Sequence, residues 1–179
     1  MAENQIIIAG FGGQGLLFSG KVLAYAGLLE GRELSWLPSY GPEMRGGTAN
    51  CSVILSDTPV GSPIVSEPDV LIAMNLPSFE KYQNAVKPGG TIILDSTLID
   101  ARPTRTDVDV YAVPATQLSN DTGLTSLANM ILAGKFLKAC MPELLDVSDA
   151  ALLKVVPPKK ANLIDANRRA LALGMDYEA

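Results

Sequence analysis

Residues 6–15 read IIIAGFGGQG, an apolar run that passes directly into a glycine-rich turn, and a helical pattern follows over 16–29. This order predicts a strand, a tight turn and a helix. The glycines at 10, 12 and 15 have the G-x-G-x-x-G spacing that lets a backbone approach a phosphate in front of a helix N-terminus. We therefore predict a phosphate-binding turn formed by Gly12, Gly13, Gln14 and Gly15. The alternative is that these glycines only allow the first helix to pack closely on a sheet.

The residues that follow argue against a nicotinamide dinucleotide as the ligand. A dinucleotide-binding unit of that type carries an Asp or Glu at the end of its second strand, about 20 residues after the glycines, to hold the ribose hydroxyls. Here the second extended segment ends in Leu37-Pro38-Ser39, and the nearest carboxylates, Glu30 and Glu33, come before that end. Because no carboxylate stands at the ribose position, NAD binding is not expected.

Extended and helical patterns alternate along the chain. Continuous apolar segments such as 70–74 indicate strands buried on both faces, as in parallel sheets. We expect an α/β fold with a mostly parallel, Rossmann-like sheet flanked by helices, forming a single domain over residues 1–179 with a helical C-terminal third. The predicted strands are 5–10, 33–38, 49–56, 70–75, 91–95 and 108–113, and the clearest helices are 14–29 and 77–86.

The connection between the second and third predicted strands cannot hold a helix of useful length. Residues 38–48 contain two prolines and three glycines, and a long, glycine-rich loop within a compact domain is often functional. An arginine and neighbouring backbone amides could surround a phosphate or carboxylate. The candidate residues are Tyr40, Glu43, Arg45, Gly46 and Gly47, with Glu43 orienting Arg45. A simple hairpin connection with an internal Glu43–Arg45 pair is the alternative.

Composition excludes several classes of function. The 179 residues include no His and only two Cys, so neither a Ser-His-Asp relay nor an ordinary four-thiolate iron-sulfur or zinc site is possible within the chain. The net charge of −5, without basic clusters, argues against nucleic acid as a partner. No apolar run approaches the length of a membrane span, and the N-terminus lacks a basic signal-peptide start, so we expect a cytoplasmic protein. Cys51 and Cys140 are expected to be buried, reduced core residues.

The helical C-terminal part has one unusual feature. Residues 127–137 are apolar around most of the predicted helix, which indicates burial, yet the segment contains Asn129 and Lys135. Both side chains would be costly inside unless paired. The helix therefore either completes a self-contained core, which we favour, or turns one face toward a partner subunit.

Five ordered motifs resemble those of a known family. The chain is similar to the gamma subunit of the 2-oxoacid:ferredoxin (acceptor) oxidoreductases. The resemblance covers nearly the whole chain, and the YGPEMRGG loop makes it far more specific than the glycine turn alone. The motifs are GFGGQG (10–15), SYGPEMRGGTANCSV (39–53), PDVLIAMNLPSFEKY (68–82), KPGGTIILDS (87–96) and KKANLIDANRRALALG (159–174).

This resemblance implies a subunit that is inactive alone. The complex would oxidatively decarboxylate a 2-oxoacid to an acyl-CoA and pass the electrons to ferredoxin or a similar acceptor. Thiamine diphosphate and the iron-sulfur clusters would lie on the alpha, beta and delta partners, so this chain itself would hold no cofactor. By similarity, coenzyme A would approach the glycine turn and the Tyr40 to Gly47 loop. The YGPEMRGG sequence of the loop and the short length of the chain favour a 2-oxoglutarate or branched-chain 2-oxoacid type.

Three alternatives remain open at this point. The chain could be the small subunit of an indolepyruvate oxidoreductase, which shares the opening motif. It could be a structural assembly subunit whose glycine loops serve packing alone. A free-standing nucleotide-binding oxidoreductase is a third class, but the absent ribose carboxylate and the absent histidine oppose it.

Overall fold

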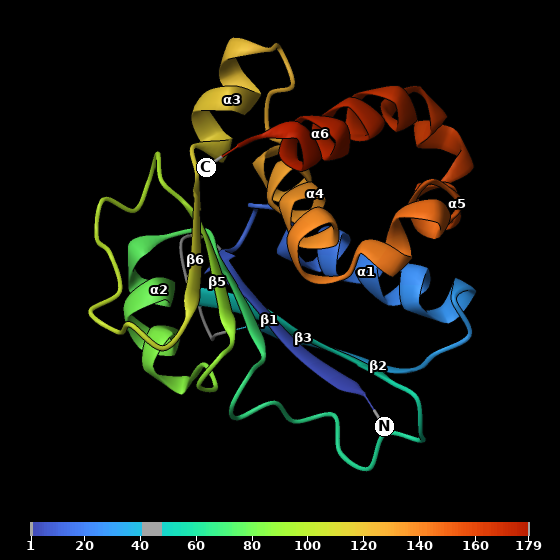
Figure 1. Ribbon diagram of the computed structural model, residues 1–179. Helices are drawn as coiled ribbons and strands as arrows, with labels where there is room; N and C mark the ends of the chain where they lie inside the picture. Colours follow the sequence, from blue (N-terminus) through green and yellow to red (C-terminus); the bar gives the residue numbers. More distant parts are fainter. Residues whose placement is uncertain (1, 41–47, 179) are drawn as a thin grey trace.

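The computed structural model describes residues 2–40 and 48–178, except for the side chain of Tyr40. It contains a six-stranded sheet in the order β2-β3-β1-β4-β5-β6, with helices on both faces (Figure 1). The strands are β1 (Glu3–Phe11), β2 (Glu33–Tyr40), β3 (Thr48–Ser56), β4 (Val70–Ala73), β5 (Thr91–Asp95) and β6 (Asp109–Val113). Each lies within about two residues of a strand predicted from the sequence.

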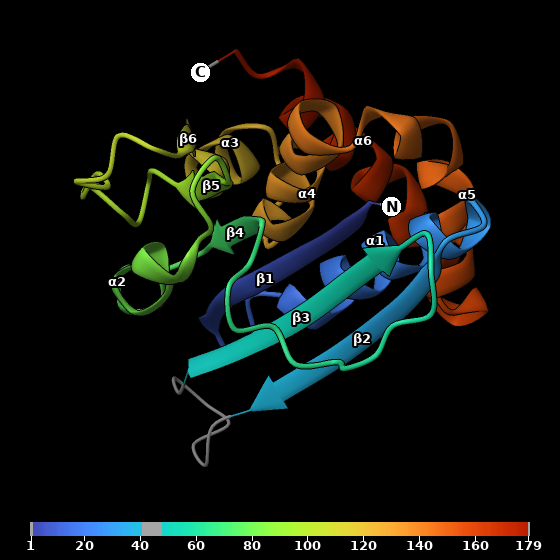
Figure 2. The same cartoon turned by 60° about the horizontal axis from the view of Figure 1, so that its bottom comes forward.

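The sheet is mostly parallel, as predicted, with one reversal. Strand β1 pairs in parallel with β4, β4 with β5, and β5 with β6. Of the strands that the structure describes, β3 alone runs the other way, antiparallel to both β1 and β2, and Figure 2 shows its arrow opposed to those two. Because β2 and β3 are neighbouring antiparallel strands, their pairing needs no helical crossover.

The helices are divided unequally between the two faces. One face carries α1 (Leu16–Leu29), α4 (Ala128–Cys140), α5 (Leu145–Val155) and α6 (Ile164–Asp176), and the other carries α2 (Leu76–Tyr82) (Figure 1). A short α3 (Ala115–Asp121) follows β6, and the 3₁₀ turns are Gln83–Ala85, Pro142–Leu144 and Pro158–Leu163. In the described ranges no helix is both long and apolar enough to cross a membrane.

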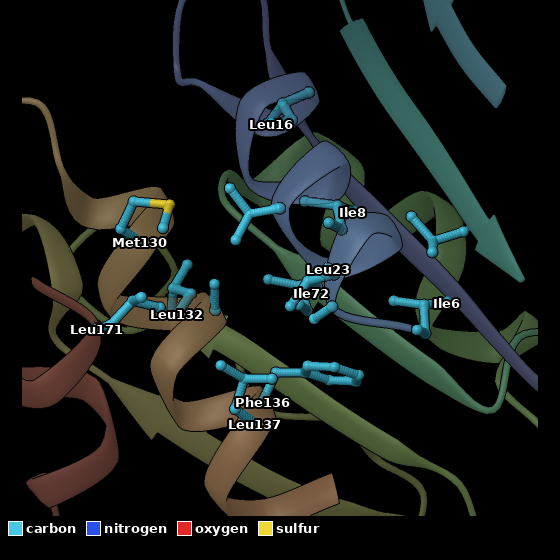
Figure 3. Packing of buried hydrophobic residues seen from close by; sticks show 14 of the residues in the cluster. Ile6, Ile8, Leu16, Leu23, Ile72, Met130, Leu132, Phe136, Leu137 and Leu171 are labelled. Carbon is cyan, nitrogen blue, oxygen red and sulfur yellow. The ribbon is translucent and has the colours of Figure 1, made fainter. Parts of the chain in front are cut away.

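The side chains of β1 contribute alternately to two hydrophobic clusters, one on each face of the sheet. Ile6 and Ile8 belong to the larger cluster under α1 and α4, whereas Ile7 and Ala9 belong to the smaller cluster that includes Phe79 of α2. This follows because successive side chains of a strand point to opposite faces. Figure 3 shows the larger cluster between the strand residues Ile6 and Ile8 and the α4 residues, among them Leu132 and Phe136.

Helix α4 is buried, as predicted, and its two buried polar side chains, Asn129 and Lys135, each form a hydrogen bond within the chain. The Asn129 amide donates to the Gly15 carbonyl at 2.9 Å, and the Lys135 ammonium donates to the Tyr177 carbonyl at 2.9 Å. Lys135 also lies over the Tyr111 ring, with its Nζ 4.8 Å from the ring centroid. These contacts favour the self-contained core over a face turned to a partner.

Two glycines explain why α6 packs so closely on α4. A Cβ at Gly134 would overlap the Leu171 carbonyl, and one at Gly174 would overlap the Ile131 carbonyl. The two helix backbones are therefore in direct contact, which only residues without a side chain permit at these crossings.

The cysteines are free thiols. Cys51 is fully buried in β3, as predicted, whereas Cys140, at the end of α4, is only partly buried. Burial raises the pKa of the Cys51 thiol to about 12 and that of Cys140 to about 11.

Candidate functional site

The glycine turn follows β1, the strand from which the sheet continues to β3 and β2 on one side and to β4, β5 and β6 on the other. From β1 the chain leaves through α1 toward β2 and β3 on one side, whereas β4, β5 and β6 extend the sheet on the other side. In open α/β sheets, ligands bind outside the carboxyl ends of the strands at such a switch point. The fold therefore places the predicted turn at the expected position for a ligand.

The Gln14 side chain forms hydrogen bonds with the ends of both β1 and β4. Its Oε1 accepts from the Phe11 amide at 2.6 Å, and its Nε2 donates to the Met74 carbonyl, just after β4, at 3.0 Å. Gly10 leaves the space for this amide, because a Cβ there would overlap Gln14 Oε1. Both ends of the Gln14 side-chain amide are therefore engaged within the chain itself.

Gly15 shapes the start of α1. It is the N-cap residue in the left-handed region, with φ of 76°, and no side chain caps the helix at this end. The first amides of an α-helix have no acceptor within the helix, so those of Leu16 to Phe18 are free to bind an anion. On the other side, the Asn129 amide holds the Gly15 carbonyl, and a Cβ on Gly15 would lie 2.5 Å from Asn129 Nδ2.

Two hollows flank the turn. One, of about 270 Å³, lies at the start of α1 and is lined by Phe11, Gly12, Gly13 and residues 15–18. The other, of about 230 Å³, lies at the ends of β1 and β4. The second is lined largely by amide and hydroxyl side chains that the sequence reasoning did not identify, namely Thr116, Ser119, Asn120, Thr125 and Ser126, together with Gly13, Gln14, Met74 and Ala128.

The far wall of the second hollow is held by a buried carboxylate. Asp95, fully buried at the end of β5, accepts from the Thr116 hydroxyl at 2.6 Å and from the Thr116 and Thr97 amides. This fixes the start of α3. Next to α4, Ser126 has a φ of 67°, a strained conformation for a residue other than glycine. Asp95 can be found from the sequence, because it is a carboxylate at the end of a predicted strand. No local pattern identifies the side chains that line the hollow.

The second predicted motif begins and ends beside the first. Phe11, at the start of the turn, is the register partner of Thr48, and Tyr40 is that of Ala49. Both ends of the segment 41–47 therefore lie at the same edge of the sheet as the glycine turn. Glu43, Arg45, Gly46 and Gly47 themselves lie outside the described residues, as does the side chain of Tyr40.

The described residues of the site offer hydrogen-bond donors suited to an anion rather than groups that would move a proton. Among the described residues, those lining the two hollows include no Asp, Glu, Lys or Arg, and their donors are backbone amides, hydroxyls and amide side chains. This set fits the phosphate groups of coenzyme A, which need donors rather than a titrating base. It does not fit an iron-sulfur cluster, because two separated cysteines cannot supply four thiolates. Within residues 2–40 and 48–178, no three His, Cys, Asp or Glu residues gather as a metal site.

Comparisons with known proteins agree with this fold and these motifs. The family described as pyruvate ferredoxin/flavodoxin oxidoreductase matches residues 5–177. Subunit VorA of the ketoisovalerate oxidoreductase of Methanothermobacter thermautotrophicus is 40% identical over 175 residues, which are 98% of this chain. Subunit KorC of the 2-oxoglutarate synthase of Methanocaldococcus jannaschii is 33% identical over 159 residues, 87% of this chain and 84% of KorC.

A solved structure extends the likeness to three dimensions. The gamma subunit of the keto/oxoacid ferredoxin oxidoreductase from Geobacter sulfurreducens has a TM-score of 0.85 at 28% identity, covering 98% of this chain and 96% of that subunit. The chain spans only 36% of the length of VorA. By the match over residues 5–177 and the likeness to KorC, the chain belongs to the pyruvate ferredoxin/flavodoxin oxidoreductase family.

Proposed function

We propose that this chain is the gamma-type subunit of a 2-oxoacid:ferredoxin oxidoreductase complex and contributes to the CoA-dependent oxidative decarboxylation of a 2-oxoacid to an acyl-CoA. The observation that carries the proposal is the glycine turn at the switch point of the sheet, with free helix amides and, as far as the described residues go, no charged side chain in its lining. Such a site binds and orients a phosphate-bearing molecule. The similarity to VorA and KorC supports a branched-chain 2-oxoacid or 2-oxoglutarate as the substrate of the complex.

The partners of the chain in this proposal are the alpha, beta and delta subunits, with ferredoxin or a similar acceptor reached through them. Thiamine diphosphate and the iron-sulfur clusters, held by those partners, supply the decarboxylation and electron-transfer chemistry. The present chain binds and positions coenzyme A through Gly12, Gly13, Gln14 and Gly15, and through the loop residues Tyr40, Glu43, Arg45, Gly46 and Gly47. We place the complex in the cytoplasm, in keeping with free thiols at Cys51 and Cys140.

The test is a titration of coenzyme A into the assembled complex with Arg45→Ala in this chain. Loss of a charge-assisted hydrogen bond to phosphate weakens binding by about tenfold. Arg169→Ala is the matched control, because Arg169 is exposed on α6 and lines neither of the two hollows beside the turn. Unchanged affinity and turnover in the Arg45 variant would count against the proposal.

A purely structural role is the second candidate, and one observation favours it. The Gln14 side-chain amide and the Gly15 carbonyl are both engaged in hydrogen bonds within the chain, which is what packing alone would require. This candidate predicts that substitutions in the two loops lower the yield of complex without changing turnover per assembled complex. The coenzyme A role predicts the reverse, so yield and turnover measured together separate the two.

A further inference from the structure

The segment that joins α5 to α6, residues 157–163, is exposed along its whole length. It consists of Pro157 and the 3₁₀ turn Pro158–Leu163, and none of these residues is buried. Figure 1 shows this α5–α6 link on the outer side of the helical layer, away from the sheet. The sequence motif at 159–174 begins within the link, and neither the core nor the candidate site accounts for the side chains there. They are therefore available to a partner.

A hollow in the helical layer opens beside the link. Its volume is about 390 Å³, and its lining includes Pro157 and Leu163 of the link, together with Phe18 of α1 and Val156, which follows α5. Single exposed leucines are common on protein surfaces, but Leu163, which is 44% exposed, lies against an apolar hollow. Such an arrangement is typical of a protein interaction site, where an apolar side chain of the partner fills the space.

The charge around the link is positive. Residues 149–169 include five basic and two acidic residues, in a chain whose net charge is −5. Both of these carboxylates pair with Arg168, whereas Lys159 and Lys160 are exposed and form no ion pair with another described residue. An acidic partner is therefore attracted to this surface and repelled by the net negative charge of the rest of the chain.

The hollow is continuous with the candidate site. Gly15 and Phe18 line both this hollow and the one in front of α1, and Ser126 lines both this hollow and the one at the ends of β1 and β4. Because the described lining of the site offers donors rather than reacting groups, the proposed function requires a partner that lies over the same edge of the chain. A partner that covers the glycine turn therefore meets the hollow and the link next.

We propose that the α5–α6 link and this hollow form the docking surface for an acidic segment of the partner subunit that covers the glycine turn. One apolar side chain of that segment fills the hollow beside Leu163, and its carboxylates pair with Lys159 and Lys160. Docking of this kind rests on the proposed function, in which a partner performs the chemistry. Pro157 and Pro158 fix the backbone of the link before binding, which lowers the entropy cost of docking.

The dissociation constant of this chain from the assembled complex tests the docking surface. It is measured by sedimentation of the complex over a dilution series, without substrate or turnover. Reversing both charges, Lys159→Glu together with Lys160→Glu, should raise the dissociation constant at least about tenfold at about 50 mM NaCl. The difference should shrink at about 500 mM NaCl, because salt screens exposed charges. Lys81→Glu is the matched control and should have no effect, since Lys81 is also exposed but lies on α2, on the opposite face of the sheet.

Leu163→Ser tests the apolar part of the surface. The dissociation constant should rise about fivefold, because less apolar area is buried on docking. Leu163 is the N-cap residue of α6 and its side chain makes no capping hydrogen bond, whereas Ser is a favourable N-cap residue. The free chain should therefore unfold at an equal or higher urea concentration, which a purely structural role of the leucine would not allow. Leu98→Ser is the control, because Leu98 is 45% exposed on the loop after β5, and it should leave the dissociation constant unchanged.

Two results would overturn the docking surface alone. They are equal dissociation constants for the double lysine variant and Lys81→Glu, or for Leu163→Ser and Leu98→Ser, and in both cases the complex still assembles, so the proposed function stands. A free chain that forms a dimer, which the lysine reversal dissociates, would assign the surface to a second copy and so also overturn the proposal. If the parent chain forms no complex with the partner subunits, the proposed function itself fails, and the docking surface fails with it.

Discussion

Replacing Gly15 by alanine should destabilise the chain through two separate effects. The left-handed φ of 76° costs a residue with a Cβ about 1–2 kcal/mol. The new Cβ would also lie 2.5 Å from Asn129 Nδ2, which forces that amide off the Gly15 carbonyl and leaves a buried donor unpaired, at about 1–3 kcal/mol. We therefore expect Gly15→Ala to lower the free energy of unfolding by about 2–5 kcal/mol.

Gly13→Ala is the matched control in urea denaturation. Gly13 has a φ of 95°, but a Cβ there would meet nothing within 4 Å, so only the backbone cost of about 1–2 kcal/mol applies. Because the second effect of Gly15→Ala passes through Asn129, the double variant with Asn129→Ala should cost about 1 kcal/mol or more less than the sum of the single variants. Equal losses at the two glycines, or strictly additive losses in the double variant, would refute the reasoning.

Further predictions concern the helix contact and the thiols. Gly174→Ala should destabilise by about 3 kcal/mol, because its Cβ meets the Ile131 backbone. Gly61→Ala, in open space, should change the urea midpoint little, and similar midpoints for the two variants would contradict the close packing of α4 and α6. The Cys51 pKa is about 12, raised by burial from an ordinary 9.0. An unfolded chain loses this proton first, so Cys51 contributes stability below about pH 9 that is lost as pH rises toward 12. Urea midpoints at pH 8 and pH 10 should fall less in Cys51→Ala than in the parent chain; an identical fall would show that Cys51 takes no part.

Much of the fold is visible in local sequence patterns. Apolar runs predict the strands, and the glycine turn predicts the joint between β1 and α1. The reversal of β3 is less visible, because a hairpin and a parallel crossover place the same apolar residues on the same strand. The one sequence feature that indicates the reversal is segment 38–48, whose prolines and glycines leave no room for a crossover helix.

Small polar residues identify helix ends less well than apolar periodicity identifies helices and strands. Residues 120–123 resemble the start of a helix, but α3 ends at Asp121 and Gly123, with φ of 71°, lies just beyond that end. Helix α4 starts at Ala128 with no side-chain cap. The same small polar residues favour either end of a helix, and tertiary packing decides which end they occupy.

Only part of the candidate site is visible in the sequence, for a physical reason. Gly12 to Gly15 form a local motif, so their spacing is visible in the sequence. The lining residues Thr116 and Ser126 reach the same hollow from about a hundred residues away, and the Asn129 bond to Gly15 spans 114 positions. Such contacts are set by how the helices pack on the sheet, and no local pattern encodes them.

In the proposed function, this chain binds and positions coenzyme A for chemistry that its partners perform. The most direct measurement is acyl-CoA formation from a 2-oxoacid, with an electron carrier present, by the partner subunits with and without this chain and by this chain alone. We expect CoA-dependent turnover only from the complete complex. Reduction of the carrier by the purified chain alone, or undiminished acyl-CoA formation by partners that lack it, would contradict the claim.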